Sequence, residues 1–227
     1  MKLIGIYNKI LRKWYELELD EYSGIFHDQN EEKIFLSEVK SAKDLLLPYY
    51  SEYVRSVSVD SMAISIELAS VLFAFCKMRK PKKVLDLGSG FSSFTFRLYQ
   101  KLFDNNCEVF SVDDDVQWLD KTRKYLVENS LSSENLLDFN IFMNDQETEE
   151  FELVLHDMNY VEIRINYLLD IIKKTKNGGF LILDDVHKND YFLSLLKLAR
   201  GRKDEFYSLK KITLDKYRRY SLLLLKR

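Results

Sequence analysis

The chain has 227 residues, of which 46% are hydrophobic and 14% aromatic, a composition that suits one domain with a sizeable buried core. The formal net charge of −2 excludes a broadly basic surface of the kind that binds nucleic acid or anionic membranes. The two cysteines, Cys76 and Cys107, lie in apolar or strand-like surroundings, which favours buried thiols in a reducing compartment.

The beginning of the chain does not resemble a secretory signal, because Lys9, Arg12 and Lys13 interrupt its apolar residues. The longest apolar stretch, residues 62–76, contains Glu67 and is short for a bilayer span. We therefore expect a cytoplasmic protein with neither a membrane nor a nucleic acid as its partner.

The first sixty residues are predicted to be helical. A second apolar stretch should end as a helix at Pro48, since proline cannot donate its backbone nitrogen to the helix. Residues 1–59 thus form an N-terminal helical extension, which would be a helix packed on its own domain, a homodimer contact or a lid over a substrate. The first helical stripe is formed by Leu3, Ile6, Ile10, Trp14 and Leu17.

A third helix is predicted to begin at a cap on Asp60 or Ser61 and to end before Pro81. From residue 83 onward, strand and helix patterns alternate. This alternation predicts an α/β, doubly wound, mostly parallel sheet of seven strands, closed by an antiparallel C-terminal hairpin. Strands are expected at 84–87, 108–113, 136–143, 151–156, 180–184, 207–213 and 220–225, and helices at 92–103, 116–127, 160–174 and 191–199. The helix 160–174 is expected to be closed by Asn177, Gly178 and Gly179. The segment between the third and fourth of these strands is short, so any helix there should be reduced.

The most informative segment is the turn after the first of these strands. Asp86 precedes Gly88, Ser89 and Gly90, and a helical pattern follows. Glycine lets a ligand lie close to the backbone, and the first N–H groups of the helix are unpaired. Asp86 would repel a diphosphate and attract a sulfonium or amino group. We therefore interpret this turn as a binding site for S-adenosylmethionine rather than for NAD.

Ligands of doubly wound sheets bind beyond the carboxyl ends of the strands, and acidic residues stand at several of these ends. Asp113 ends the strand 108–113 and is placed to accept hydrogen bonds from the hydroxyls of a ribose, with a helix cap as the alternative. Asp145 follows the strand 136–143 and would accept from an adenine amino group, unless it belongs to a solvated acidic loop.

Three more aspartates, Asp157, Asp184 and Asp185, follow two later strands that we expect to be neighbours. Close carboxylates repel one another unless a cation balances them, and their oxygens suit Mg²⁺. Successive strand residues point to opposite faces, so the chain must bend at or before Asp185 for all three to converge. The alternative is one capping carboxylate and one solvated carboxylate.

Two neighbouring side chains are candidates for catalysis or substrate contact. His187 is placed to act as a general base on a substrate hydroxyl, although a loop histidine is also a common surface residue. Tyr160 would contact substrate near the same edge, unless it packs on the sheet at a helix start. His156 lies inside an apolar strand and is interpreted as a core residue.

These residues resemble a class I S-adenosylmethionine-dependent methyltransferase. The segment Val84-Leu-Asp-Leu-Gly-Ser-Gly90 is similar to the first motif of that family, and Asp113 to its ribose-binding acid. Asp145 is similar to its adenine-side acid, and 178–183 to its fifth strand. The resemblance covers residues 60–227, the expected methyltransferase domain, and implies a Rossmann-like methyltransferase fold.

Within this class, the segments 155–157 and 183–186 resemble the metal-binding segments of catechol-type and macrolide-sugar O-methyltransferases. The resemblance implies a small-molecule acceptor whose hydroxyl is activated by bound Mg²⁺. The catechol type has a lysine where this chain has Tyr160, so His187 or Lys188 would replace it as the base. The implied metal ligands are Asp157, Asp184 and Asp185.

Three other interpretations stay open at this stage. A metal-independent methyltransferase acting on nitrogen or on a macromolecule would commonly carry a Pro-Pro pair after its fourth strand, and the segment 156–160 has no proline. An NAD-dependent oxidoreductase would place a third glycine where Ser93 stands. A non-catalytic methyltransferase-like binding module would keep the cofactor turn without turnover.

Overall fold

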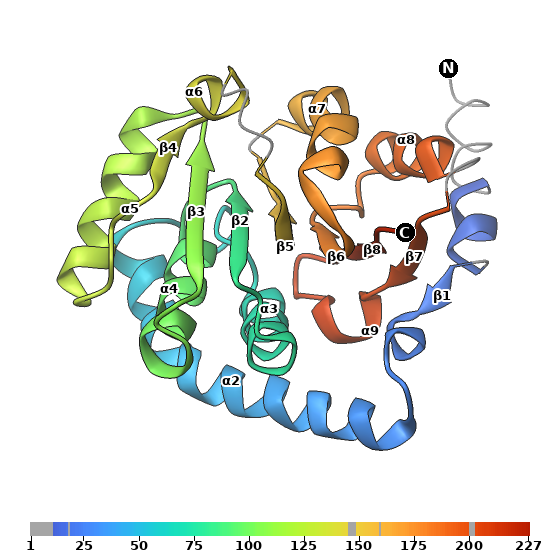
Figure 1. Cartoon of the computed structure of the whole chain (residues 1–227), viewed down its shortest axis with the longest axis horizontal. Helices are drawn as coiled ribbons and strands as arrows, with labels where there is room; N and C mark the ends of the chain where they lie inside the picture. Colours follow the sequence, from blue (N-terminus) through green and yellow to red (C-terminus); the bar gives the residue numbers. More distant parts are fainter. Residues whose placement is uncertain (1–10, 18, 145–148, 159, 200–202) are drawn as a thin grey trace.

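The computed structural model describes residues 11–17, 19–144, 149–158, 160–199 and 203–227, and it centres on a twisted sheet between two layers of helices (Figure 1). The strands are β1 (Asp20–Glu21), β2 (Lys83–Leu87), β3 (Glu108–Asp113), β4 (Leu136–Asp138), β5 (Phe151–His156), β6 (Thr175–Leu183), β7 (Glu205–Ser208) and β8 (Leu222–Leu225). The helices are η1 (Tyr22–Ile25), α2 (Gln29–Ser56), α3 (Ile66–Arg79), α4 (Phe91–Phe103), α5 (Val116–Glu128), α6 (Phe139–Asn144), α7 (Val161–Lys174), α8 (Asn189–Ala199) and α9 (Lys210–Thr213).

The described sheet has eight strands in the order β1-β7-β8-β6-β5-β2-β3-β4. The strand β8 is antiparallel to both of its neighbours, and every other described pairing is parallel. The predicted doubly wound sheet and its antiparallel C-terminal pair are confirmed. The expected number of seven strands was one too few, because Asp20 and Glu21 add a short parallel edge beside β7.

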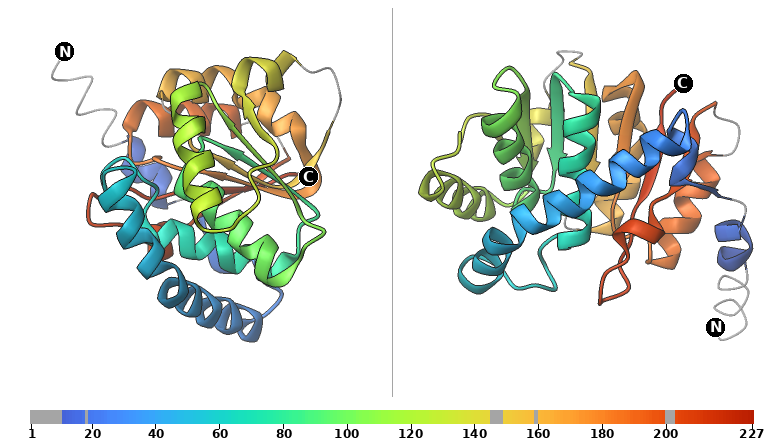
Figure 2. Two further views of the ribbon diagram at one scale, coloured as in Figure 1. Left: turned by 90° about the vertical axis from the view of Figure 1, so that its left-hand side faces the viewer. Right: turned by 90° about the horizontal axis from the view of Figure 1, so that it is seen from below.

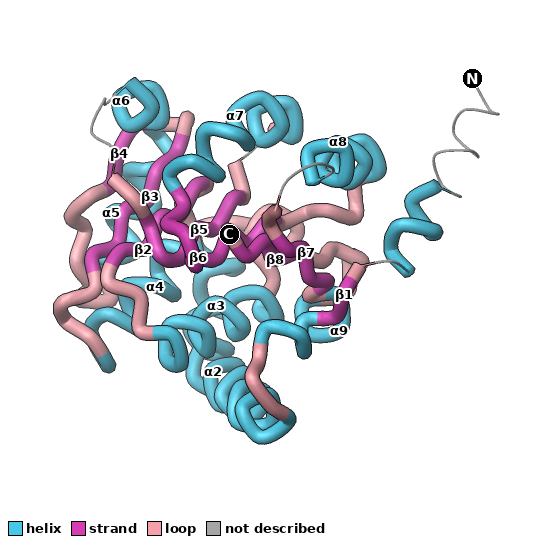
Figure 3. The backbone as a smooth tube through the Cα atoms, turned by 45° about the vertical axis from the view of Figure 1, so that its right-hand side comes forward, coloured by secondary structure: helices cyan, strands magenta, loops and turns pink. Residues whose placement is uncertain are grey.

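Each face of the sheet is covered by its own set of helices (Figure 3). One apolar core includes buried side chains of α2, α3, α4 and α5, and the other includes those of α6, α7 and α8. The central strand β2 contributes Val84 to the first core and Leu85 and Leu87 to the second, as alternation along a strand requires. Asp86 therefore points to the same face as Val84, toward α4.

Helix α3 begins later than the sequence predicted. Its cap is Ser65, whose hydroxyl accepts from the Leu68 N–H at 3.0 Å, rather than Asp60 or Ser61. Ser65 is followed at once by apolar residues that are buried nearly all round, so the first favourable cap is the one beside them. Residues 57–65 consequently form a connection between α2 and α3 that is free to line a ligand site.

Helix α2 does not end at Pro48 but continues through it to Ser56. An interior proline removes one helical hydrogen bond and costs about 3 kcal/mol. Burial offsets this cost, since Phe35, Leu46 and Tyr53 of α2 pack in the same core as α3 and α4. Seen from below in Figure 2, α2 runs across the other helices of its face. This part of the predicted N-terminal extension is thus packed on the domain itself.

Two expected strands are shorter than predicted, and a helix follows each. The strand expected at 136–143 ends at Asp138, because the Asp138 carboxylate accepts from the N–H groups of Asn140 and Ile141 and starts α6. The strand expected at 207–213 ends at Ser208, and α9 follows. Helix α6 has only six residues, so the helix between β4 and β5 is short, as expected.

The glycine pair expected to close the helix 160–174 belongs to a strand instead. Helix α7 ends at Lys174, and both Gly178 and Gly179 lie within β6. Gly178 has φ +78° and its N–H donates to the Lys226 carbonyl at 2.8 Å.

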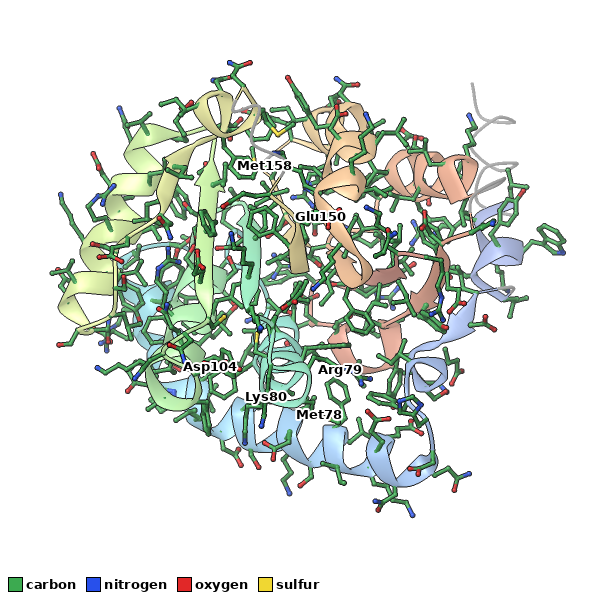
Figure 4. The ribbon with its side chains drawn as sticks, in the orientation of Figure 1. Met78, Arg79, Lys80, Asp104, Glu150 and Met158 are labelled. Atoms are coloured by element: carbon green, nitrogen blue, oxygen red, sulfur yellow. The ribbon has the colours of Figure 1, made fainter. Side chains whose placement is uncertain are left out.

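The residues from the end of η1 to the start of α2 are held in place by the last residue of α3. Arg79, labelled in Figure 4, donates to the Ile25 carbonyl at 3.0 Å and pairs with Glu31 at 3.0 Å. Of the predicted first stripe, Leu3, Ile6 and Ile10 lie outside the described residues, whereas Trp14 and Leu17 are exposed.

None of the described helices combines the length and the apolar character needed to traverse a bilayer. Cys76 and Cys107 are both buried free thiols, as predicted.

Candidate functional site

The turn between β2 and α4 is held in a conformation that requires glycine. Gly88 has φ +104°, and its N–H donates to the Val112 carbonyl of β3 at 2.8 Å. A Cβ on Gly88 would lie 2.2 Å from the Asp157 carbonyl oxygen, so the backbones after β2 and β5 touch here. Gly90, with φ +153°, directly precedes α4. The turn thereby brings the start of α4 beside the end of β5.

Asp86 lies beneath this turn rather than on a ligand-facing wall. Its side chain is fully buried, and its Oδ2 accepts from Ser93 Oγ at 2.5 Å and from Ser111 Oγ at 2.9 Å. Ser93 Oγ in turn accepts from the Gly90 N–H at 3.1 Å. Burial raises the pKa of Asp86 to about 6, against the opposing effect of these hydroxyls. Asp86, which was predicted to contact the cofactor, is not among the described residues that line the cavity and instead supports the turn from below.

A buried arginine supports Asp86 from behind. Arg97 of α4 donates to Ser111 Oγ at 2.7 Å and to the Glu134 carbonyl at 2.7 Å. Its positive charge lowers the pKa of Asp86 and partly compensates the burial of the carboxylate. A guanidinium that is 1% exposed must satisfy its donors internally, and this network does so. The cofactor turn is thus anchored from the core.

A cavity of about 190 Å³ opens directly above the turn. Three aspartates and three aromatic rings contribute to its wall, and no lysine or arginine is found among the described residues that line it. The lining residues come from the turn, from α2, from the 57–65 connection, from the starts of α4 and α5, and from the ends of β3 and β5: Tyr53, Met62, Ala63, Ile64, Gly88, Ser89, Gly90, Phe91, Ser92, Asp113, Asp115, Trp118 and Asp157.

Asp113 lies on the wall of this cavity, at the end of β3. Its two oxygens accept from the N–H groups of Ser89 at 2.7 Å and Asp115 at 3.0 Å. Burial raises its pKa above the ordinary value, although these N–H groups oppose the shift. The helix-cap role belongs to Asp115, which accepts from the first N–H groups of α5. Asp113 is therefore available to a ligand through its remaining lone pairs.

The residues that line the cavity suit a nucleoside ligand that carries a positive charge. Acidic side chains, with no basic one among the described lining residues, disfavour a diphosphate and favour a sulfonium with an amino group. The indole of Trp118 donates to the Ser89 carbonyl at 2.6 Å, which presents an aromatic ring beside the turn. This donor and acceptor set is compatible with S-adenosylmethionine, and Asp113 lies on the cavity wall at the end of β3.

The three later aspartates do come together, as predicted, at the carboxyl ends of β5 and β6. The chain bends at Asp185, which has φ +59°, so the geometric requirement for their convergence is met. Between them lies Arg164 of α7, whose Nη2 is 2.7 Å from Asp157 Oδ1 and 3.6 Å from Asp185 Oδ2. Asp184 Oδ1 accepts instead from Ser221 Oγ at 2.7 Å.

Neighbouring cations compensate the charge of Asp185, whereas burial raises the pKa of Asp157 well above its ordinary value despite the opposing charge of Arg164. Burial would raise the pKa of Asp185, but Arg164, Lys188 and His187 outweigh it and lower that pKa. Burial, followed by the charge of Asp185, raises the pKa of Asp184 to about 6. The ammonium of Lys188 lies 2.7 Å from Asp185 Oδ2.

The predicted Mg²⁺ site does not fit this arrangement. A divalent ion needs several carboxylate oxygens turned toward a common point, with no competing cation between them. Here Asp157 and Asp185 are turned toward Arg164, and Asp184 toward Ser221. Within the described part of the chain, no group of three histidine, cysteine, aspartate or glutamate residues is arranged to hold a metal ion.

The predicted catalytic residues lie outside the cavity wall. His187 is 3.5 Å, Nδ1 to Oδ1, from Asp185, and its side chain is 30% exposed. Tyr160 is 61% exposed just before α7, so its ring is not packed on the sheet. His156 is a buried core residue, as predicted, and burial lowers its pKa to about 3. Asp145 lies outside the described residues.

Sequence patterns missed four side chains that shape the site. Tyr53 and Trp118 look like ordinary core aromatics of amphipathic helices, and only the tertiary structure brings them to the cavity. Arg97 and Arg164 are charged residues within helices, a position typical of solvent exposure. Both arginines lie on otherwise apolar helical faces, and this pattern could have indicated that they are buried. The acids that they contact, however, are distant in sequence.

Comparisons with known proteins place this architecture among methyltransferases. No protein-family model matches the sequence, and no curated protein matches it. A putative O-methyltransferase from Klebsiella pneumoniae matches with a TM-score of 0.63 and 11% identity, over 82% of this chain and 90% of that chain. An O-methyltransferase from Bacillus cereus, solved in complex with SAH, matches with a TM-score of 0.61 and 12% identity, over 81% and 89%.

A different acceptor class also occurs among the matching structures. A putative rRNA methylase from Clostridium thermocellum matches with a TM-score of 0.51 and 17% identity, over 64% of this chain and 86% of that chain. At these identities the similarity shows the fold and leaves the acceptor to the chemistry of the site. The chain thus has the class I S-adenosylmethionine-dependent methyltransferase fold.

Proposed function

We propose that this protein is an S-adenosylmethionine-dependent methyltransferase that acts on a hydroxyl group of a small molecule. The observation that carries the proposal is the acid-lined cavity formed by the glycine turn, with Asp113 at the end of β3. Two of the structural neighbours described above are O-methyltransferases by name, which supports oxygen as the acceptor atom. The net charge of −2 favours a small molecule over nucleic acid.

When bound, S-adenosylmethionine supplies a methyl group on a positively charged sulfur. The protein's task is to hold that methyl in line with the acceptor oxygen, which is largely a matter of orientation. The carboxylate of Asp113 would accept from the ribose hydroxyls, and the 57–65 connection would close the methionine side through Met62 and Ile64. Asp86 and Ser93 would keep the turn between them in shape.

His187 is the candidate base that would remove the proton from the hydroxyl group of the acceptor. With Nδ1 facing Asp185, the free Nε2 would take the proton of the substrate hydroxyl. Burial, together with nearby cations, lowers the pKa of His187 below 6.5, so the ring is neutral and able to accept a proton near pH 7. Tyr160, exposed beside the same edge, would contact the acceptor.

A direct test is to incubate the protein with S-adenosylmethionine and panels of phenols, sugar hydroxyls and amines, and to quantify S-adenosylhomocysteine and product by mass spectrometry. We expect S-adenosylhomocysteine to form in step with an O-methylated product, and to fall strongly in His187→Ala but not in a control, Lys197→Ala, on the exposed side of α8. Turnover with amines alone would contradict the hydroxyl assignment.

A further inference from the structure

Arg164 makes four polar contacts at the edge where a metal ion was expected. Its side chain is 3% exposed, and its Nη2 lies 2.7 Å from Asp157 Oδ1 and 3.6 Å from Asp185 Oδ2. Its Nη1 donates to the Asp184 carbonyl at 3.1 Å, and its Nε donates to the Met158 carbonyl. Thus each arm of the guanidinium is engaged, and all partners belong to the segments that follow β5 and β6.

Three carboxyl groups that converge in a buried place must be neutralised, either by nearby positive charge or by protonation. A planar guanidinium with several donors is well suited to bridge two carboxylates and two carbonyls at once. We propose that Arg164 is the built-in counter-cation of this acid cluster and takes the place of a divalent metal ion. Lys188, 2.7 Å from Asp185, supplies the second positive charge. With the function proposed above, it follows that methyl transfer by this protein needs no divalent ion.

Arg164 also acts as a positioning residue for the cofactor cavity. It holds both Asp157, through its carboxylate, and Met158, through its carbonyl. Met158 lies just beyond β5 (Figure 4) and is fully buried. The carbonyl of Asp157 is the group that approaches Gly88 most closely, so the same arginine fixes one wall of the cavity.

The proposal predicts how the full-length protein responds to Mg²⁺. Thermal unfolding is measured for wild type, Arg164→Met and Arg164→Lys in 10 mM MgCl₂ and in 1 mM EDTA. We expect no difference for wild type or for the conservative Arg164→Lys variant. In Arg164→Met the unbalanced carboxylates become a cation site, and Mg²⁺ at a hundred times its Kd would raise Tm by about 5–10 °C.

The result that overturns the proposal is a saturable, sub-millimolar binding of Mg²⁺ or Mn²⁺ to the wild-type protein that disappears in Asp184→Asn. Isothermal titration calorimetry on these two proteins decides the question even if Arg164→Met fails to fold. An Arg164→Met protein that folds and gains no response to Mg²⁺ also contradicts it. S-adenosylhomocysteine is titrated into the same samples, because its failure to bind would refute the proposed function and leave the metal result intact.

Discussion

Gly88→Ala is the substitution that probes the cofactor turn most sharply. The added Cβ would lie 2.2 Å from the Asp157 carbonyl oxygen and 2.6 Å from its carbon, both of them backbone atoms. Ordinary contact begins at 3.4 Å, so the segments after β2 and β5 must move apart by about an ångström. Positive φ adds strain of about 1–2 kcal/mol for a residue with a side chain. Overpacking adds about 1–3 kcal/mol.

The combined cost of about 2–5 kcal/mol is a large part of the stability of about 5–15 kcal/mol that is typical of a domain. At about 2–4 °C per kcal/mol for a chain of this size, we expect a visible fall in Tm. Displacement of the Asp157 wall should also weaken binding of S-adenosylhomocysteine on the order of tenfold or more, since such sites tolerate little misplacement.

Gly178→Ala is the matched control for this experiment. Gly178 also has positive φ, +78°, but a Cβ there meets nothing within 4 Å. It should therefore show only the strain of about 1–2 kcal/mol and bind S-adenosylhomocysteine as wild type does. The two variants are compared by thermal unfolding and by calorimetric titration. Equal affinity of Gly88→Ala and Gly178→Ala for S-adenosylhomocysteine would refute the role assigned to the turn.

Three further predictions concern the same site. Asp113→Ala should lower the affinity for S-adenosylhomocysteine by about 10- to 100-fold, the cost of hydrogen bonds to a charged group, as measured by calorimetry; unchanged affinity would remove Asp113 from the ribose site. The folded-state pKa of Asp86, about 6, exceeds the ordinary aspartate value of 3.8, so its stabilising contribution is present below pH 3.8 and lost as the pH rises through 6. Ser93→Ala removes a hydrogen-bond donor to the ionised Asp86 carboxylate and raises the pKa of Asp86 further, so the fall in Tm should be larger at pH 8 than at pH 5. An equal fall in Tm at both pH values would disprove the link between Ser93 and the ionisation of Asp86. Trp118→Phe loses one hydrogen bond to the turn and should cost about 0.5–1.5 kcal/mol in urea unfolding; no change would show that this bond does not stabilise the turn.

Features that depend on local pattern were predictable from the sequence. Apolar runs located the strands, and alternation with helices established a parallel sheet, because parallel strands need crossover helices. The turn at Gly88 followed from its glycines. The meeting of Asp157, Asp184 and Asp185 followed from the rule that strand ends share one edge of the sheet.

Features that depend on tertiary contact were not predictable. Pro48 is a strong local stop signal, yet the burial of α2 against the other helices outweighs it. The location of Asp86 beneath the turn depends on which face of β2 meets α4. Arg164 occupies the edge expected for Mg²⁺, and although it lies on an otherwise apolar face of α7, the acids that it contacts are distant in the sequence. In each case the deciding partner is remote in the sequence.

The most direct measurement is calorimetric titration of the folded wild-type protein with S-adenosylhomocysteine, and in parallel with NAD. The acid-lined cavity predicts saturable binding of the first ligand at micromolar concentration or below and none of the second. Binding of NAD would contradict the assignment of this cavity to S-adenosylmethionine. So would a protein that unfolds cooperatively, and is therefore folded, but does not bind S-adenosylhomocysteine.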